Sequence, residues 1–185
     1  MEASDEELML SYRSGDASAF DRLYARHKGP LFRFMLRSIK DRAVAEELYQ
    51  EAWMRAIEAR HRYEPQAKFT TWLYTIAHNH MVDHWRRRGL SLVSMDAGGA
   101  DGDPVDPPAS AAEDPLRQLE GREKLARFAE ALAALPEAQR EAFLLSEEAE
   151  MTVAQIAAAT GSNEEAAKSR LRYALKKLKL AVGDD

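Results

Sequence analysis

The sequence predicts an all-α protein of two small helical domains joined by a flexible acidic linker. Apolar residues recur at the three-and-four spacing of amphipathic helices, and no stretch alternates polar and apolar residues as a β-strand would. Residues 89–114 break this pattern with Gly, Pro, Ala, Ser and Asp, and the helical pattern resumes after Pro115. We therefore expect one domain over residues 1–88, a linker over 89–114 and a second domain over 115–185.

Capping residues predict where the first two helices begin. Ser4, followed three residues later by Glu7, has the sequence of a capping box, and this first helix should end near Gly15. Asp16 is expected to cap the second helix. Gly29-Pro30 should kink or restart that helix, because proline removes a backbone hydrogen-bond donor.

A third helix is predicted after Asp41, with two chemically different faces. One face is apolar and includes Leu48 and Trp53. The other face carries acidic and amide side chains, namely Glu46, Glu47, Gln50 and Glu51. Such a stripe is by default solvated, but it is equally suited to docking a basic partner.

A fourth helix is predicted over residues 69–88, after a loop that contains a proline. The helix ends in Arg86-Arg87-Arg88, which complements the negative end of the helix dipole. With Trp72, Tyr74 and Trp85 nearby, these arginines also suit an anionic polymer, because aromatic faces stack on unpaired bases for about 1–3 kcal/mol per base. The alternative for the aromatic side chains is core packing, and we expect it for Trp72.

Three histidines on this helix, His78, His80 and His84, raise the question of a metal site. No further ligands are evident, and no glutamate stands where the zinc-protease motif requires one. We interpret the histidines as polar, partly exposed helix positions. The chain has no cysteine, and no nucleophile–base pair, phosphate loop or glycine fingerprint appears. The sequence therefore predicts neither an enzyme nor a bound cofactor.

The second domain contains a predicted helix-turn-helix. Thr152 should cap a short helix that Gly161 ends, and Asn163 should cap a final helix from Glu164 to about Val182. That final helix carries the basic residues Lys168, Arg170, Arg172, Lys176, Lys177 and Lys179. A DNA-binding motif is the interpretation we favour, and a helical hairpin with a solvated basic face is the alternative.

The net charge of −5 argues against a nucleic-acid partner until its distribution is considered. Residues 1–88 hold 15 Lys/Arg against 13 Asp/Glu, residues 89–114 hold six Asp/Glu and no Lys/Arg, and residues 115–185 hold 11 against 12. Residues 166–182 alone carry six basic residues and no acid. Because screening limits charge interactions to about 10 Å at 0.1 M salt, the local charge matters at a DNA surface.

The length of the linker and the composition of the chain limit how far apart the two domains can lie and where the protein is expected in the cell. As flexible coil, a linker of this length spans roughly 28 Å root-mean-square, and roughly 86 Å when fully extended. The acidic, polar N-terminal residues predict no signal peptide, and no apolar run approaches the ~18 residues of a membrane span. The absence of cysteine fits a reducing cytoplasm, so we expect a cytoplasmic protein without membrane insertion.

These segments, in this order, resemble the extracytoplasmic-function sigma factors of bacterial RNA polymerase. Gly15-Asp16 with Ala19-Phe20 and Leu23-Tyr24 is similar to their opening region, and residues 45–53 are similar to their core-polymerase-binding motif. Residues 69–87 resemble the motif that melts and reads the minus-ten element. Four segments of the second domain resemble the family domain that reads the minus-thirty-five element: Leu135-Pro136, Arg140–Phe143, Ile156-Ala157 and Lys168–Leu171.

The resemblance implies a sigma region 2 bundle, a sigma region 4 helix-turn-helix and a role for each site residue. Core polymerase would be bound at its β′ clamp by Glu46, Glu47, Gln50 and Glu51, with the β flap as a further contact. Minus-ten DNA would be bound by Glu64, Lys68, Asn79, Asp83, Arg86, Arg87 and Arg88, the loop from Glu64 to Lys68 and Asn79 capturing a flipped base. Minus-thirty-five DNA would be bound by Glu164, Glu165, Lys168, Ser169, Arg170, Arg172 and Lys176. An anti-sigma factor is the expected inhibitory partner.

One departure from the family pattern and two rival functions remain at this point. Where family members often have Gly-Thr-Val before Lys-Ser-Arg, this chain has Glu165-Ala166-Ala167, so its minus-thirty-five preference is an open question. A stand-alone helix-turn-helix regulator would bind duplex DNA without polymerase. A sigma-like decoy would occupy an anti-sigma factor, and the acidic Glu164 and Glu165 are compatible with that reading.

Overall fold

The computed structural model describes residues 3–87 and 115–183, with side chains from residue 121 onward in the second stretch. Within this part of the chain the structure is helical and contains no strand. Its elements are α1 (Asp5–Arg13), α2 (Ala17–Ile39), α3 (Arg42–Ala59), the 3-10 helix η1 (Arg60–Arg62), α4 (Phe69–Arg87), α5 (Pro115–Ala134), α6 (Glu137–Glu148), α7 (Val153–Thr160) and α8 (Glu164–Val182). The expected linker and Arg88 lie outside the described residues.

The predicted helix starts are confirmed atom by atom. Ser4 and Glu7 form a reciprocal capping box on α1. The side chain of Asp16 accepts a hydrogen bond from the backbone of Ser18, and Asp41 accepts one from Val44. These caps satisfy backbone N–H groups that the first turn of a helix leaves without partners.

The restart predicted at Gly29-Pro30 is wrong, because α2 runs from Ala17 to Ile39 without interruption, and the kink stays a prediction. Two features explain the continuity. Gly29 has no Cβ to crowd the proline ring, which is the usual obstacle to helical backbone before proline. The flanking Leu23, Leu31 and Phe34 are fully buried on one face of α2, and this packing outweighs the loss of one helix hydrogen bond.

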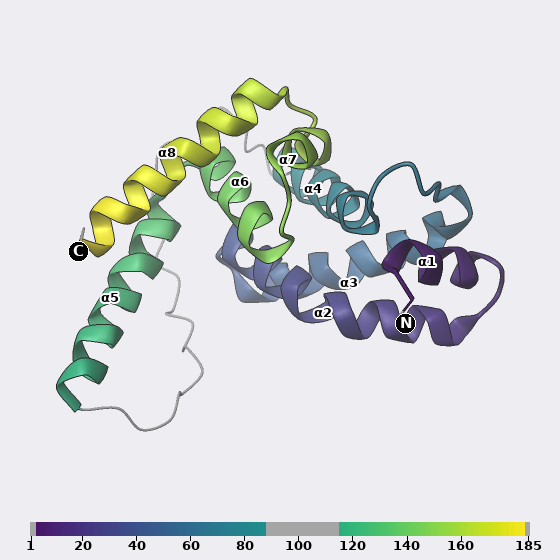
Figure 1. Cartoon of the computed structure of the whole chain (residues 1–185), viewed down its shortest axis with the longest axis horizontal. Coiled ribbons are helices and arrows are strands. Elements are labelled where there is room, and N and C mark those ends of the chain that lie inside the picture. Colours follow the sequence, from purple (N-terminus) through teal and green to yellow (C-terminus); the bar gives the residue numbers. More distant parts are fainter. Residues whose placement is uncertain (1–2, 88–114, 184–185) are drawn as a thin grey trace.

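The N-terminal helices form one packed group, shown from purple to blue-teal in Figure 1. Helix α2 packs against α1 and α3, and α3 packs against α4. Their core includes Met35 of α2, Trp53 of α3, and Leu73 and Met81 of α4. Most of the predicted apolar face of α4 is buried, but Trp72 and Ile76 are only half-buried, and Thr71, Tyr74 and His80 are buried beside it. The opposite face is left to solvent.

The C-terminal helices form a second group around α8. Helices α5, α6 and α7 all contact α8. The turn between α7 and α8 depends on Gly161, whose backbone has φ +62° and ψ +26°, the left-handed conformation that glycine adopts without strain. Small buried residues, Ala157, Ala159 and Ala167, let α7 and α8 approach closely.

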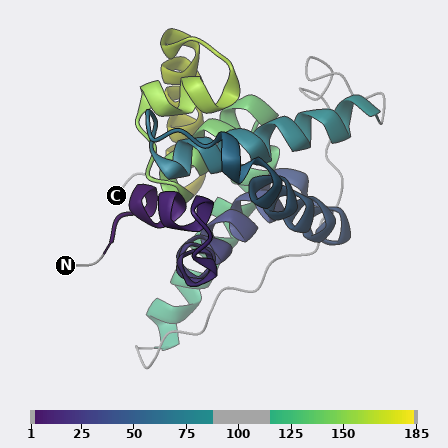
Figure 2. The same ribbon diagram turned by 90° about the vertical axis from the view of Figure 1, so that its right-hand side faces the viewer.

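The two groups pack directly against each other. Helix α6 lies against α2 and α7 lies against α4, and the buried side chains form one continuous cluster. Figure 1 shows α6 and α7 between α8 and the N-terminal helices, and in the turned view of Figure 2 the C-terminal helices still lie beside the N-terminal ones. None of the helices within residues 3–87 and 115–183 is both long enough and apolar enough to cross a membrane.

Candidate nucleic-acid interface

The face of α4 that points away from the core is the centre of the candidate interface. Asn79, Arg86 and Arg87 are exposed on it, whereas the buried side of the same helix holds Leu73 and Met81. The N-terminus of α4 is fixed from a distance, because the backbone N–H of Phe69 donates to the carboxylate of Glu6 in α1 at 2.9 Å. This bond joins α1 to the start of α4 and holds the end of the preceding loop in place.

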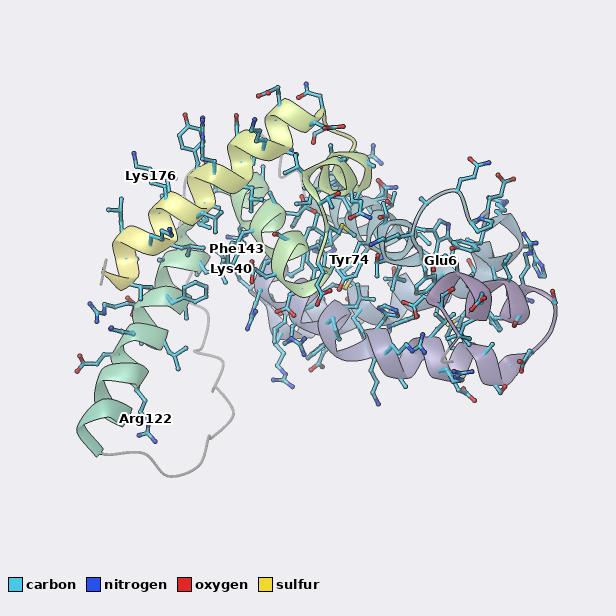
Figure 3. All side chains as sticks on the ribbon, in the orientation of Figure 1. Glu6, Lys40, Tyr74, Arg122, Phe143 and Lys176 are labelled. Carbon is cyan, nitrogen blue, oxygen red and sulfur yellow. The ribbon has the colours of Figure 1, made fainter. Side chains whose placement is uncertain are left out.

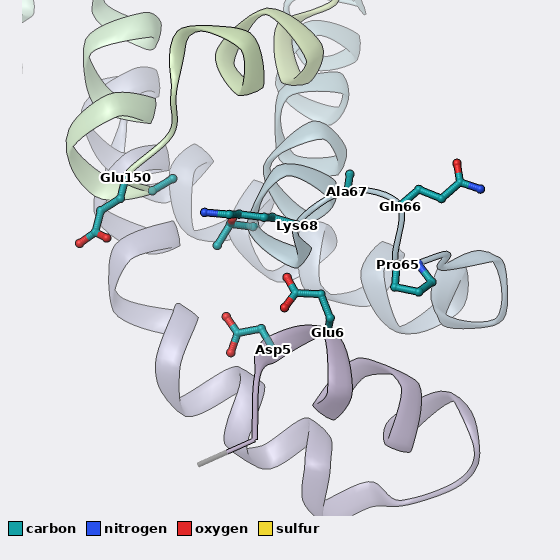
Figure 4. Close-up of a pocket in the computed structure, with 9 residues that line it drawn as sticks. Asp5, Glu6, Pro65, Gln66, Ala67, Lys68 and Glu150 are labelled. Atoms are coloured by element: carbon teal, nitrogen blue, oxygen red, sulfur yellow. The ribbon is translucent and has the colours of Figure 1, made fainter. Parts of the chain in front are cut away.

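That loop, residues 63–68, borders an open cavity of about 510 Å³. The other walls are Asp5 and Glu6 of α1, Thr70 of α4, and Ala149 and Glu150, which follow α6. Figure 4 shows the carboxylates of Asp5 and Glu6 below the cavity and Lys68 extending across it toward the side of Glu150. The predicted residues Glu64 and Lys68 are both exposed. The cavity thus joins the expected base-capturing loop to a turn from the C-terminal group.

The arginine end of α4 is organised by Asp83. Its carboxylate accepts a hydrogen bond from Arg86 at 2.7 Å and lies 3.9 Å from Arg55 of α3. Asp83 is therefore engaged within the protein, where it orients Arg86 at the surface. Arg87 is exposed, and no ion pair is found for it among the described residues.

The aromatic side chains of α4 serve mainly the core. Tyr74 and Trp85 are buried, so the prediction that they stack on bases is wrong for the arrangement seen here. Trp72 is half-buried, with its ring centroid 5.2 Å from that of Tyr63 and 5.9 Å from that of Phe69. The aromatic cluster stabilises the loop that precedes α4.

His78 and His84 of α4 are partly exposed, as expected, whereas His80 differs from the expectation. His80 is 1% exposed, and its Nε2 lies 2.7 Å from a carboxylate oxygen of Glu51 in α3. Burial and the nearby charge of Arg55 lower the pKa of His80, although Glu51 opposes them. The expectation is therefore wrong for His80, which joins α3 to α4. No group of three possible ligands for a metal ion is found in residues 3–87 and 115–183.

The acidic stripe on α3 is exposed as a surface. Glu47 and Gln50 are exposed without hydrogen bonds among the described residues, whereas Glu46 accepts one from Arg42 at 2.9 Å. Glu51 is exposed at its outer side and engaged with His80 at its inner side. Beside the stripe, Met54 is 56% exposed, which adds an apolar contact area to the negative charge.

The predicted recognition helix α8 presents its basic residues outward. Asn163 caps it by accepting a hydrogen bond from Ala166 at 2.8 Å. Most of the predicted DNA-binding side chains are exposed, and Ser169 and Arg170 are half-buried; the exposed ones are Glu164, Glu165, Lys168, Arg172 and Lys176. In Figure 3, Lys176 projects from the side of α8 that faces away from the other helices.

An apolar groove of about 390 Å³ lies between α5 and the end of α8. Its lining includes Phe128 and Phe143, whose ring centroids are 6.0 Å apart, and Leu175 of α8. Leu125 and Leu180 are more than half exposed on the same helices. Apolar side chains in this pattern offer a docking surface for another apolar element.

Polar contacts between the two helical groups were not anticipated from the sequence. Glu148 of α6 receives hydrogen bonds from Arg33 and Arg37 of α2. Glu141 of α6 lies 2.6 Å from Nδ1 of His78 in α4. In the sequence each of these residues looks like a charge exposed to water. The partners are 63 to 115 residues apart in the chain, so no local pattern reveals the pairs.

The pKa of His78 is set by charged residues of both helical groups. Burial lowers the pKa of His78, but the hydrogen bond with Glu141 and its negative charge outweigh that effect and raise the pKa overall. The positive charge of Arg170 in α8 acts in the lowering direction. A residue of the expected minus-thirty-five surface thus acts electrostatically on the residue that precedes Asn79.

Comparisons with known proteins cover nearly the whole chain. Residues 23–90 match the family model for Sigma-70 region 2, and residues 125–178 match the model for Sigma-70, region 4. RNA polymerase sigma factor CarQ of Myxococcus xanthus is 31% identical over 176 residues, covering 95% of this chain and 96% of CarQ. The ECF RNA polymerase sigma factor SigK of Mycobacterium sp. (strain KMS) is 28% identical, covering 95% and 89%.

Two solved structures share the fold. The sigma factor RpoE, in complex with the anti-sigma factor NepR from Bartonella quintana, superposes with a TM-score of 0.70 at 24% identity, covering 88% of this chain and 96% of that one. CnrH, in complex with the cytosolic domain of CnrY, superposes with a TM-score of 0.66 at 24% identity, covering 96% of each chain.

Proposed function

This chain belongs to the extracytoplasmic-function sigma factors of bacterial RNA polymerase, and from this premise we propose how its residues divide the work of promoter recognition. A sigma factor binds core polymerase, directs it to promoters with minus-ten and minus-thirty-five elements, and initiates transcription. The observation that carries the assignment is the exposed row on α4, in which Asn79 and Arg87 stand on the solvent side of a helix that otherwise builds the core.

Minus-ten recognition is assigned to α4 and its preceding loop. Glu64, Lys68 and Asn79 would hold a base flipped out of the non-template strand. Flipping costs a few kcal/mol in lost stacking and pairing, and contacts made only to the flipped base offset that cost. Arg86, oriented by Asp83, would hold the adjacent DNA backbone together with Arg87. Arg88, which lies outside the described residues, is proposed to extend this contact.

Core-polymerase docking is assigned to the acidic stripe of α3. Glu47 and Gln50 are free to meet a basic partner at its surface, and Met54 adds apolar contact. Glu46 would exchange its pairing with Arg42 for the partner. Glu51 would contribute charge while it remains beside His80. We propose that the β′ clamp binds here and that the apolar groove between α5 and α8 receives the β flap.

Minus-thirty-five recognition is assigned to α8. Lys168, Arg172 and Lys176 are exposed along one helix and suit phosphate contacts, whereas Ser169 and Arg170 stand partly inside the protein. Glu164 and Glu165 at its first turn favour the helix dipole, and a glutamate can accept a hydrogen bond from cytosine N4. We expect this acidic start to narrow the set of duplexes that α8 accepts.

The two helical groups must separate for both promoter elements to be bound. The elements are about 25 base pairs apart by their names, or about 85 Å of duplex at 3.4 Å per base pair. In the structure, α7 packs against α4 and α6 packs against α2, so the two groups are together. We propose that this packed arrangement is that of the free protein. We propose that residues 89–114 serve as the acidic linker along which the groups move apart on polymerase.

Control of this sigma factor is proposed to involve an anti-sigma factor. RpoE and CnrH, which share the fold, were each solved in complex with another protein, NepR and the cytosolic domain of CnrY. We propose that an inhibitor of this kind binds the same docking surfaces as polymerase. We place this activity in the cytoplasm, beside core polymerase, and assign the chain no catalytic reaction of its own.

The test is run-off transcription by core polymerase reconstituted with the full chain, on promoters selected from genomic DNA. Transcription that requires the chain supports the proposal. Binding to duplex DNA without core polymerase, with no run-off product, would instead indicate a stand-alone regulator, and capture of an anti-sigma factor without run-off would indicate a decoy.

The residue assignment is tested with Asn79→Ala. We expect it to reduce open-complex formation, measured by permanganate footprinting, far more than it reduces core binding. His61→Ala, an exposed position on η1, is the matched control. Equal melting by the Asn79 variant and wild type would contradict the assignment.

A further inference from the structure

Two arginines of α2 hold one carboxylate from the other helical group. Nε of Arg33 donates to one oxygen of Glu148 at 2.8 Å, and Arg37, one helical turn later, donates to the other oxygen. The arginine side chains are 50% and 44% exposed, whereas that of Glu148 is 7% exposed. A Cβ on Gly29 would come within 3.3 Å of the Arg33 guanidinium, so glycine leaves this group room to lie along α2.

This pairing belongs to the packed arrangement of the two groups. Glu148 is delivered by α6, which lies against α2 only while the groups are together. Separation of the groups on a promoter withdraws Glu148. It leaves two guanidinium groups, one turn apart on the same helix, without their counter-charge. Because the two groups previously bound both oxygens of one anion, their spacing already suits a second anion of similar size.

The position of this pair connects it to the base-capturing loop. Ala149 and Glu150, which follow Glu148 directly, line the cavity that Lys68 and Thr70 border from the other side. One turn beyond Thr70 on α4, the hydroxyl of Tyr74 is buried and has no hydrogen-bond partner among the described residues. Its ring packs edge-on against Phe34, the neighbour of Arg33, at 5.1 Å between centroids.

The pKa of Tyr74 depends on the charges around it. Burial raises the pKa of Tyr74, the negative charge of Glu148 raises it further, and Arg33 acts in the opposite direction. The tyrosine hydroxyl therefore stands within electrostatic reach of both members of the pair. A polar group without a partner at this place is a further donor for an anion that replaces the carboxylate.

We propose that Arg33 and Arg37 form a phosphate site for the non-template DNA strand beside the captured base, and that Glu148 occupies this site in the free protein. This inference rests on the proposed function, because it requires a promoter strand at the loop of residues 63–68. A phosphodiester presents two anionic oxygens, as a carboxylate does, and arginine side chains bind either group through paired N–H donors. Glu148 thus keeps the site from other anions until the groups separate.

A simple alternative is a latch, in which the arginines do nothing except hold Glu148. The two interpretations predict different effects of these variants on open-complex formation by reconstituted holoenzyme. If the pair is only a latch, Glu148→Gln and the double variant Arg33→Ala/Arg37→Ala both loosen the packed state and change open-complex formation in the same direction. If the pair binds phosphate, the arginine variant loses a DNA contact that the glutamate variant keeps.

The experiment measures open-complex formation by holoenzyme on a labelled promoter over a range of salt concentrations. We expect Arg33→Ala/Arg37→Ala to lower the equilibrium constant by at least about tenfold. The slope of its logarithm against the logarithm of salt concentration should become shallower by about 0.7 per lost single-strand contact. Glu148→Gln should leave the constant unchanged or raise it up to about tenfold. The matched controls are Arg22→Ala on α2 and Glu147→Gln on α6, both exposed.

The possible outcomes separate the inference from the function on which it rests. A lower constant and a shallower salt slope in the arginine variant, with an unchanged or raised constant in the glutamate variant, support the phosphate site. Parallel changes in the two variants, or an unchanged constant and slope in the arginine variant, overturn it while wild-type run-off still upholds the sigma function. Failure of wild type to direct run-off overturns both. Circular dichroism of each variant shows that it is folded.

Discussion

Arg140 is a buried charge at the contact between the two helical groups. Only 4% of the residue is exposed. Its guanidinium donates to the carbonyl oxygens of Ala133 and Leu135 at the end of α5 and to that of Ser38 in α2, each at 3.2 Å. One of its nitrogens also lies 3.5 Å from a carboxylate oxygen of Glu137. We predict that Arg140→Leu destabilises the protein severely.

The magnitude follows from the partners that the substitution leaves behind. Two buried carbonyl groups and one part-buried carbonyl group lose charge-assisted hydrogen bonds, and Glu137 loses the positive charge that offsets its burial. Breaking a buried ion pair by removing one partner costs about 3–5 kcal/mol. For a chain of this size each kcal/mol lowers the melting temperature by roughly 2–4 °C. The expected fall is therefore roughly 6–20 °C.

The effect should also depend on pH through Glu137. Burial raises the pKa of Glu137 from 4.5 to about 7, although Arg140 opposes the shift. A carboxyl whose pKa is raised on folding stabilises the protein below its unfolded pKa, and this stabilisation is lost as pH rises through the folded pKa. Without Arg140 the pKa of Glu137 rises further, so we expect a larger loss of stability at pH 8 than at pH 5.

Thermal unfolding followed by circular dichroism measures both effects. Arg122→Leu makes the same chemical change at an exposed position of α5 and should alter the melting temperature little (Figure 3). Glu137→Gln should remove the decline in stability that wild type shows from about pH 4.5 to 7. A loss below about 1 kcal/mol for Arg140→Leu, equal at pH 5 and pH 8, would refute this account of the buried cluster.

Two further predictions concern the His78–Glu141 contact between the groups and the proposed docking face of α3. The hydrogen bond and charge of Glu141 raise the pKa of His78 despite burial and Arg170, so their contact stabilises the packed state below pH 6.5 and weakens as pH rises through the folded pKa. Energy transfer between dyes on the two groups should report opening on that rise in wild type. His78→Gln should reduce this pH dependence to the part that Glu137 contributes. Glu47→Lys should weaken core binding in a β′ pull-down by about tenfold, whereas Asp21→Lys on α2 should not; equal retention of both variants would count against the docking face.

Sequence patterns predicted the helices well because helix ends are set by local chemistry. The caps at Ser4, Asp16 and Thr152 involve residues within three positions of one another, so the sequence contains both partners. Pro30 failed as a helix breaker for the opposite reason. Its effect was decided by the burial of neighbouring side chains against other helices, which no local window contains.

The candidate site was predictable only where it faces solvent. Asn79 and Arg86 lie on the face opposite the apolar stripe of α4, and periodicity alone places them there. His80 could not be interpreted in this way, since a polar residue on an apolar face can be buried with a partner, and its partner Glu51 comes from another helix. The acidic stripe of α3 likewise looks uniform in the sequence, although one of its residues, Glu51, contacts the buried His80.

The polar pairs between the two groups give the packed state a property that apolar contacts would not. Apolar surfaces, once separated, would have to be covered again or stay exposed at a cost of about 25 cal/mol per Å². Arg33, Arg37 and Glu148 instead separate into groups that water solvates well, so the cost of opening at this point is small. The same charges are then available to a different partner. The polar part of the contact is therefore suited to the proposed change from a closed free protein to one that is open on DNA, and the same change would free the arginines of the proposed phosphate site.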